Sequence, residues 1–141
     1  MTRLLITAVA LALSLATAHA GGDWNDKGIA WQAFEAGLAK AKQEKKPVML
    51  IVFTEWCPHC TSYSKLFHDQ KVVEKSRQFV MVRVDKDKQP DVSRKHAPDG
   101  VLDPALDAKR DKYRYFYNES DPTEVLAGMD AALAKLNAKP K

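Results

Sequence analysis

The chain has 141 residues and a formal net charge of +4, from 22 Lys and Arg against 18 Asp and Glu. This length predicts a single domain that can bury a core without a disulfide to hold it together. Basic and acidic residues are interspersed and no basic stripe with aromatic residues occurs, so nucleic acid is not an expected partner.

The first twenty residues have the pattern of a cleaved secretory signal. Arg3 precedes an apolar run from Leu4 to Leu15, and Ala18-His19-Ala20 is a small-x-small cleavage site. The run is too short for a membrane-spanning helix, so stable membrane insertion is not expected. Cleavage after Ala20 leaves one domain, residues 21–141, which we expect in the periplasm, or in the secretory lumen of a eukaryotic host.

The next segment predicts a lead-in, a helix and a buried strand. Gly21–Lys27 is interpreted as flexible, with Trp24 as a possible anchor. Apolar residues recur at helical spacing from Ile29 to Lys45, and Pro47 ends the helix. The unbroken apolar run Val48–Phe53 is typical of a central parallel strand that is buried on both faces.

A second helix and strand follow. The pattern predicts a helix from Cys57 to Phe67, a helical turn at Val72–Glu74 and a strand at Phe79–Asp85. The charged run Asp85–Lys88 lacks the rest of a calcium-loop pattern and is interpreted as a solvated turn.

The last third of the chain is harder to assign. Residues 89–112 are polar, are interrupted by prolines and glycine, and receive no element. The aromatic run Tyr113–Tyr117 predicts a strand. Asp121 is a predicted N-cap, with Pro122 at the first position of the last helix and Glu124 completing a capping box.

The only two cysteines lie three residues apart in Thr54-Glu55-Trp56-Cys57-Pro58-His59-Cys60. Residues i and i+3 of a helix share a face with Cβ atoms roughly 5–6 Å apart, so a small adjustment brings the pair to the roughly 4 Å that a disulfide needs. A bridge across two residues removes little chain entropy, which argues against a purely structural disulfide. Cys57, at the helix N-terminus, is the expected nucleophile and Cys60 the buried resolving cysteine.

Three neighbours are candidate supporting residues. Pro58 falls at the first helical position, where its fixed φ suits the helix. His59 can stabilise a Cys57 thiolate by charge or by a hydrogen bond, although an exposed histidine without a role is the alternative. Trp56 is expected to shield the pair and to contact substrate, although simple packing remains open.

The order of elements around Trp-Cys-x-x-Cys resembles the thioredoxin fold, and in particular the small exported proteins of the thioredoxin-7 type and the anterior-gradient proteins. The likeness covers most of residues 27–137. The segments that carry it, apart from the cysteine motif, are Ile29–Trp31, Lys45–Met49, Phe79–Val84, Ala97–Gly100 and Leu102–Pro104. The dipeptide Pro58-His59 is shared with the DsbA-type periplasmic oxidants.

This resemblance implies a three-layer α/β/α thioredoxin fold with two departures. Thioredoxins carry a buried carboxylate six residues before the first cysteine, where this chain has Ile51. In the family, a cis-proline opens a strand beside the cysteines. The corresponding region of this chain, residues 98–106, is about eight residues shorter than the resemblance implies. A loss of that size is large, because connections between elements are normally only a few residues long. Pro98 and Pro104 are the two candidates for that proline.

The predicted function is exported thiol–disulfide exchange with protein substrates through Cys57 and Cys60. A redox partner must reset the pair, the chain is expected to be a monomer, and no metal or organic cofactor is implied. Two alternatives stay open. Two thiolates with His59 would bind copper or zinc, although a closed zinc site needs four ligands. A non-catalytic member of the family is the other.

Overall fold

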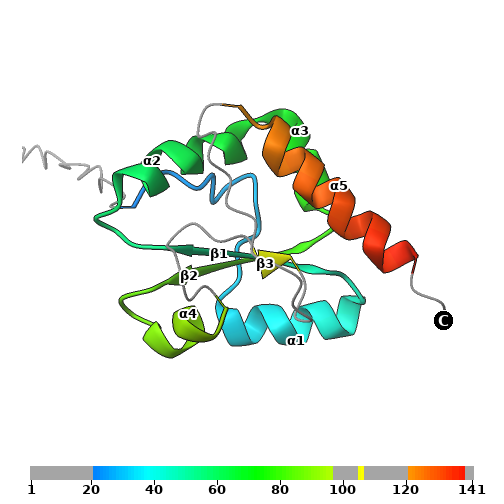
Figure 1. Ribbon diagram of the computed structural model, residues 1–141, viewed down its shortest axis with the longest axis horizontal. Coiled ribbons are helices and arrows are strands. Elements are labelled where there is room, and N and C mark those ends of the chain that lie inside the picture. Colours follow the sequence, from blue (N-terminus) through cyan, green and yellow to red (C-terminus); the bar gives the residue numbers. More distant parts are fainter. Residues whose placement is uncertain (1–20, 97–104, 107–120, 139–141) are drawn as a thin grey trace, which may run out of the picture.

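The computed structural model describes residues 21–96, 105–106 and 121–138 (Figure 1). The predicted signal at residues 1–20, the two candidate prolines Pro98 and Pro104, and the predicted strand Tyr113–Tyr117 lie outside these ranges.

A three-stranded sheet in the order β2-β1-β3 forms the centre of the molecule. Strand β1 (Val48–Phe53) runs parallel to β2 (Val80–Asp85) over its whole length, with Val48 opposite Val80 and Phe53 opposite Asp85. Strand β3 (Ala105–Leu106) is antiparallel to β1. The predicted central parallel strand is therefore confirmed, and a strand does form within the shortened region, although it has only two residues.

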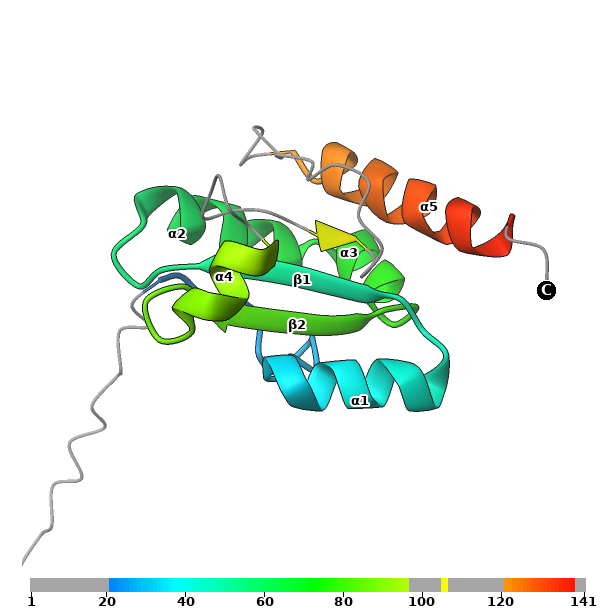
Figure 2. The same cartoon turned by 60° about the horizontal axis from the view of Figure 1, so that its bottom comes forward.

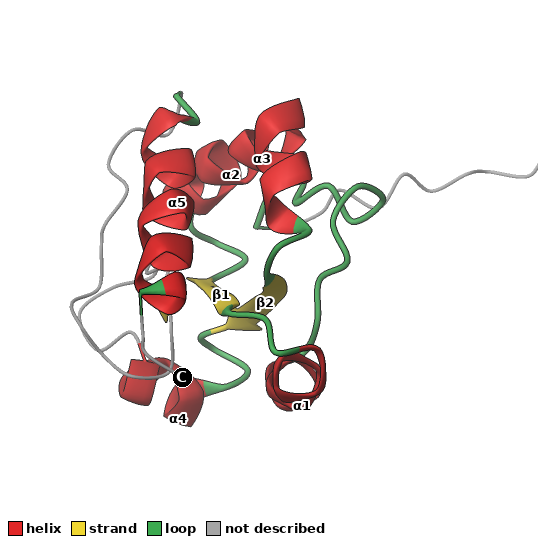
Figure 3. Cartoon of the chain, turned by 90° about the vertical axis from the view of Figure 1, so that its right-hand side faces the viewer, coloured by secondary structure: helices red, strands yellow, loops and turns green. Residues whose placement is uncertain are grey.

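Helices cover both faces of this sheet (Figures 1 and 3). On one face lie α1 (Phe34–Glu44) and α4 (Pro90–His96). The other face carries α2 (Pro58–Ser64), the 3₁₀ turn η1 (Lys65–His68), α3 (Gln70–Ser76) and α5 (Thr123–Asn137). This arrangement confirms the predicted three-layer α/β/α architecture.

The alternation of side chains along β1 divides the core into two apolar clusters. Met49 and Ile51 belong to the cluster beneath α2, α3 and α5, whereas Leu50 and Val52 belong to the cluster above α1 and α4. All four side chains are at most 3% exposed. The unbroken apolar run thus reflects a strand that is covered on both faces.

The first helix begins five residues later than predicted, at Phe34 instead of Ile29. The reason is that Gln32 pairs with the outer edge of β2: its N–H donates to Met81 and its carbonyl accepts from the N–H of Arg83. Trp31 still packs against the core, but from an extended segment and not from a helix.

The lead-in is packed and not flexible, so that prediction was wrong, although Trp24 does anchor it. The Trp24 side chain is 3% exposed, and its ring contacts those of Trp31, Phe53 and Phe67. Its indole N–H donates to the carbonyl of Gly21, 2.9 Å away. This aromatic cluster holds the segment against the face of the sheet that carries α2.

Later elements differ from prediction in extent. The turn predicted at Val72–Glu74 is a full helix, α3, whose N-cap Asp69 accepts from two backbone N–H groups. Helix α4 was not predicted at all. The last helix begins at Thr123, one residue later than expected, and the Asp121 carboxylate accepts from the Thr123 N–H at 2.9 Å.

Gly22 is the position at which the lead-in is most sensitive to substitution. Its φ of +102° suits glycine, and a Cβ there would lie 2.4 Å from the Ser64 hydroxyl oxygen and 3.0 Å from the Thr61 Cα. We expect Gly22→Ala to lower the free energy of unfolding by about 2–4 kcal/mol, measured by urea denaturation. Adding Ser64→Ala should recover part of the loss, whereas a change below about 0.5 kcal/mol would contradict the packed lead-in.

Candidate active site

The carboxyl end of β1 delivers the cysteine motif to the start of α2. Thr54, directly after the strand, is fully buried, and its carbonyl accepts from the Cys57 N–H at 3.4 Å. Cys57 is the N-cap of α2, with extended backbone angles, and Pro58 occupies the first helical position as predicted. The predicted strand–turn–helix context of the motif is therefore present.

The cysteine sulfur atoms have different surroundings. The Cys60 N–H donates to the Cys57 Sγ at 3.2 Å, so the Cys57 sulfur takes the place of a capping oxygen. Cys57 is 7% exposed and Cys60 is completely buried. Both are free thiols in this structure. Of the two residues, only Cys57 keeps any exposed surface.

Burial raises the pKa of the Cys60 thiol to about 12, and its contact with the Cys57 sulfur acts in the same direction. Backbone N–H groups, those of Thr54 and Cys60, partly oppose this shift. At neutral pH the Cys60 thiol is therefore protonated, and it must lose that proton before it can act as a nucleophile.

Trp56, immediately before Cys57, is 69% exposed, which is unusual for so large an apolar side chain. Its indole N–H donates to the Asp87 carboxylate at 2.8 Å. The ring is thus tethered to Asp87, in the turn after β2, instead of being buried.

A second link joins the same two loops. Lys88 pairs with Glu55 at 2.5 Å and with Asp85 at 3.3 Å. These carboxylates raise the pKa of Lys88, the hydrogen bond to Glu55 contributing most. Glu55 is therefore a surface ion-pair partner of Lys88.

The remaining predicted residues lie where the motif places them. His59 is exposed in the first turn of α2, between the two cysteines. Ile51 is completely buried and stands opposite Arg83 in the sheet. The Arg83 guanidinium pairs with Asp26 of the lead-in at 2.9 Å.

Sequence reasoning missed two contributors to the site, Asp87 and Lys88, which had been assigned only to a solvated turn. The signal was available, because the carboxyl ends of adjacent parallel strands lie at the same edge of a sheet. Polar residues directly after the second strand therefore lie near the cysteine motif. The burial of the Thr54 side chain could not be predicted in this way.

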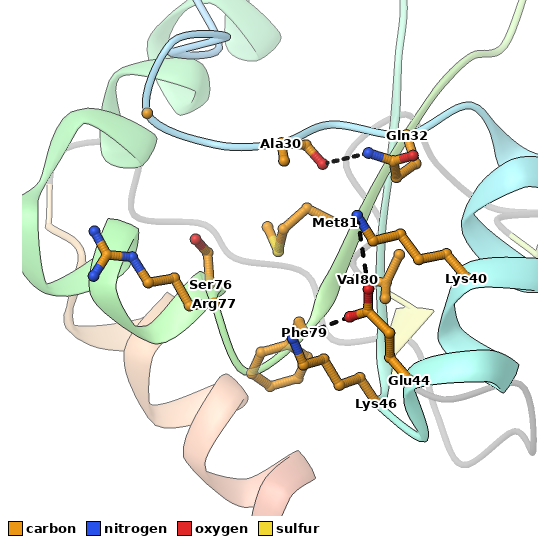
Figure 4. A pocket seen from close by; sticks show the side chains of 11 residues that line it. Ala30, Gln32, Lys40, Glu44, Lys46, Ser76, Arg77, Phe79, Val80 and Met81 are labelled. Carbon is orange, nitrogen blue, oxygen red and sulfur yellow. Dashed lines mark hydrogen bonds and ion pairs between the residues drawn. The ribbon is translucent and has the colours of Figure 1, made fainter.

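The pocket shown in Figure 4 lies away from the cysteines. It encloses about 240 Å³ at the amino end of β2, between Gly28–Gln32 and the end of α1. Its polar groups largely pair with one another: Glu44 binds Lys40 and Lys46, and the Gln32 amide donates to a nearby carbonyl. We therefore do not assign the candidate site to this pocket.

Among residues 21–96, 105–106 and 121–138, no group of three or more His, Cys, Asp or Glu side chains is placed to hold a metal ion. In the same residues no helix is long and apolar enough to cross a membrane.

Comparisons with known proteins agree with this geometry. Residues 30–107 match the family model described as thioredoxin-like. The anterior gradient protein 2 homolog of Homo sapiens is 31% identical over 131 residues, covering 82% of this chain and 73% of that protein. The thiol:disulfide interchange protein DsbD of Vibrio vulnificus is 44% identical over 63 residues, 44% of this chain but only 10% of that protein.

A thioredoxin from Thermus thermophilus has a similar structure, with a TM-score of 0.64 over 77% of this chain and 89% of that one. The two sequences are 19% identical, so this likeness concerns the fold alone. It confirms the predicted thioredoxin fold.

The different burial of the sulfur atoms predicts different reactivity. In the folded, reduced protein at neutral pH, iodoacetamide should modify Cys57 and leave Cys60 unmodified, because Cys60 is buried and protonated. Peptide mass spectrometry after a short exposure measures both sites, and the urea-unfolded protein, in which both react, is the control. Equal modification of the two cysteines in the folded protein would contradict the assignment.

Proposed function

Because the chain belongs to the thioredoxin-like family, we propose that it is an exported thiol–disulfide oxidoreductase that exchanges disulfides with protein substrates. The observation that carries this proposal is the hydrogen bond from the Cys60 N–H to the Cys57 Sγ, combined with the unequal burial of the two sulfur atoms. Cys57 keeps some exposed surface and its sulfur accepts a backbone hydrogen bond, whereas Cys60 is fully buried in the same helical turn.

The exchange proceeds in two steps. In the reducing direction the Cys57 thiolate attacks a substrate disulfide, and one substrate sulfur leaves as a thiolate. The Cys60 thiolate then attacks the Cys57 sulfur of the mixed disulfide, releasing the second substrate sulfur and forming the Cys57–Cys60 disulfide. Two electrons pass to the substrate, and a redox partner must return them to the pair. Oxidation of a substrate is the reverse sequence.

Trp56 supplies a contact surface for the substrate. An exposed indole held by Asp87 beside the reactive sulfur offers apolar area without losing side-chain freedom on binding, since its orientation is already fixed. Such a surface would bind an extended peptide segment that contains a cysteine, with low sequence specificity.

Export rests on the predicted signal at residues 1–20, and it gives the cysteine pair a compartment in which protein disulfides persist. The rival interpretation, a copper or zinc carrier, requires ligands beyond the two thiolates. Metal analysis of the purified, reduced protein separates the two functions, because the carrier should retain stoichiometric metal and the oxidoreductase should not.

Substitution of each cysteine tests the assigned roles. Cys57→Ser should abolish exchange, because no accessible thiolate remains, whereas Cys60→Ser should accumulate mixed disulfides with substrate proteins. Non-reducing electrophoresis of alkylated extracts shows the trapped species, and the double variant is the control. Exchange activity in Cys57→Ser, or no trapped species in Cys60→Ser, would overturn the roles.

His59 should set the redox potential of the pair. If it stabilises the Cys57 thiolate, His59→Ala favours the disulfide and lowers the potential by roughly 30 mV, the equivalent of about 1.4 kcal/mol. Equilibration in glutathione buffers with trapping of free thiols measures this shift. The wild-type value gives the direction of exchange, since about −120 mV marks a disulfide donor and about −270 mV a reductant. An unchanged potential in His59→Ala would assign this histidine no role.

A further inference from the structure

The first two residues of the lead-in lie against the loop and the helix that carry the cysteines. Both Gly21 and Gly22 are buried. A Cβ on Gly21 would lie 3.2 Å from the Cα of Glu55, and one on Gly22 would lie 3.0 Å from the Cα of Thr61. Figure 1 shows this start of the lead-in, in blue, beside the first turn of α2. Gly21 therefore contacts the short loop that leads from β1 to Cys57.

The conformation and the contacts of Gly21 hold it at this place. Its φ of +85° suits glycine, and a Cβ there would lie 3.1 Å from the Phe53 ring. Its carbonyl accepts from the indole N–H of Trp24 at 2.9 Å. Because the Trp24 ring is packed in the core, the backbone of Gly21 stays close to the Glu55 loop.

The predicted cleavage after Ala20 turns the backbone nitrogen of Gly21 into an α-amino group. Two covalent bonds separate that nitrogen from the Cβ position, so it lies within about 6 Å of the Glu55 Cα. An α-amino group has a pKa of roughly 7.7–8.0 and is mostly protonated at neutral pH. A charge at a buried position is costly unless an opposite charge pairs with it.

The Glu55 carboxylate has the capacity for a second partner. Lys88 binds its Oε1 at 2.5 Å, and a carboxylate accepts at both of its oxygens. The Glu55 side chain is 49% exposed, so it is not locked in place by packing. A glutamate carboxylate reaches roughly 4 Å from its Cα, which covers most of the distance to the Gly21 nitrogen.

The acidic residues of the lead-in itself already have basic partners. Asp23 lies 3.3 Å from the His68 ring, and Asp26 lies 2.9 Å from the Arg83 guanidinium. Glu55 is therefore the carboxylate that we expect to take the charge of the new N-terminus.

We propose that cleavage of the signal completes this part of the molecule, because the freed Gly21 ammonium binds the Glu55 carboxylate. Hydrolysis of the Ala20–Gly21 peptide bond by a signal peptidase consumes one water and leaves a carboxylate on Ala20 and an ammonium on Gly21. Before cleavage the same nitrogen is an uncharged amide, so the pair belongs to the mature protein only. Together with Lys88, the ammonium then holds the loop that carries Trp56.

This inference rests on the export part of the proposed function and is independent of thiol–disulfide exchange, since the pair involves neither cysteine. The mature N-terminus tests it first. After expression of residues 1–141 in a Gram-negative host, the intact mass of the periplasmic protein should correspond to residues 21–141. A different first residue, or a retained signal, would overturn the proposal, because the ammonium would then lie elsewhere.

A double-mutant cycle tests the pair. Ligation of a synthetic peptide, residues 21–56, to residues 57–141 at Cys57 gives mature chains with a free or an acetylated Gly21. Acetylation should raise the unfolding equilibrium constant, measured in urea, about two- to fivefold more in the chain with Glu55 than in Glu55→Gln. Glu35→Gln is the matched control, since Glu35 is exposed in α1 on the other face of the sheet and should leave the effect of acetylation unchanged.

Titration of the α-amino group gives a readout that a purely structural Glu55 would not move. In chains with ¹⁵N-labelled Gly21, NMR should give a higher pKa for this group in wild type than in Glu55→Gln, because a paired carboxylate favours the ammonium. The imidazoles of His59 and His68 and the ammonium of Lys88 are present in both chains, so the comparison isolates Glu55.

The outcomes separate this pair from the exchange activity. Equal pKa values in the two chains, or a difference below about twofold in the cycle, would overturn the pair and leave the exchange activity untouched. A coupled pair in a protein that exchanges no disulfides would support this inference, and the exchange part of the proposed function would fail alone.

Discussion

The burial of the four central residues of β1, on both faces of the sheet, is the constraint on which the rest of the structure depends. A strand with apolar neighbours on both faces and hydrogen-bonded strands on both edges has one register, because a shift by one residue would exchange its two sets of side chains. That fixed register positions Thr54, the first residue beyond the strand. It thereby fixes Cys57 at the start of α2 and Cys60 beneath it. The reactivity of the pair is thus set by the strand as much as by the helix, and Figure 2 shows the strand leading into α2.

Arg83 explains why the lead-in is ordered. Its position in β2 directs it to the apolar face that carries α2, where a charge needs compensation. Asp26 supplies the opposite charge, and the rings of Trp24, Trp31 and Phe53 surround the guanidinium with centroids at 5.4–5.8 Å. The lead-in supplies Asp26 and one of the three rings, that of Trp24. The lead-in, which is polar and glycine-rich in sequence, is therefore held in part by a charge 57 residues further along the chain.

The sequence predicted those elements whose signal is local. The run Val48–Phe53 gave the central strand with its bounds, and the Cys-x-x-Cys motif placed Pro58 and Cys57 correctly at the start of a helix. The sequence-based prediction failed where contacts between residues far apart in the chain determine the local structure. Gln32 continues a helical pattern but pairs with β2, and no local feature reveals that edge. The same holds for Asp87, whose bond to Trp56 depends on two loops that meet only in the folded sheet.

The geometry of β3 bears on which proline corresponds to the cis-proline of the family. Strand β3 is antiparallel to β1, with Ala105 opposite Leu50 and Leu106 opposite Met49. Its amino end therefore faces the end of β1 that leads to Cys57. In the family the proline opens a strand beside the cysteines, and in this sequence Pro104 directly precedes Ala105, whereas Pro98 stands further back. Both prolines lie outside the described residues, so the choice between them stays a prediction, for which chain position and strand direction favour Pro104.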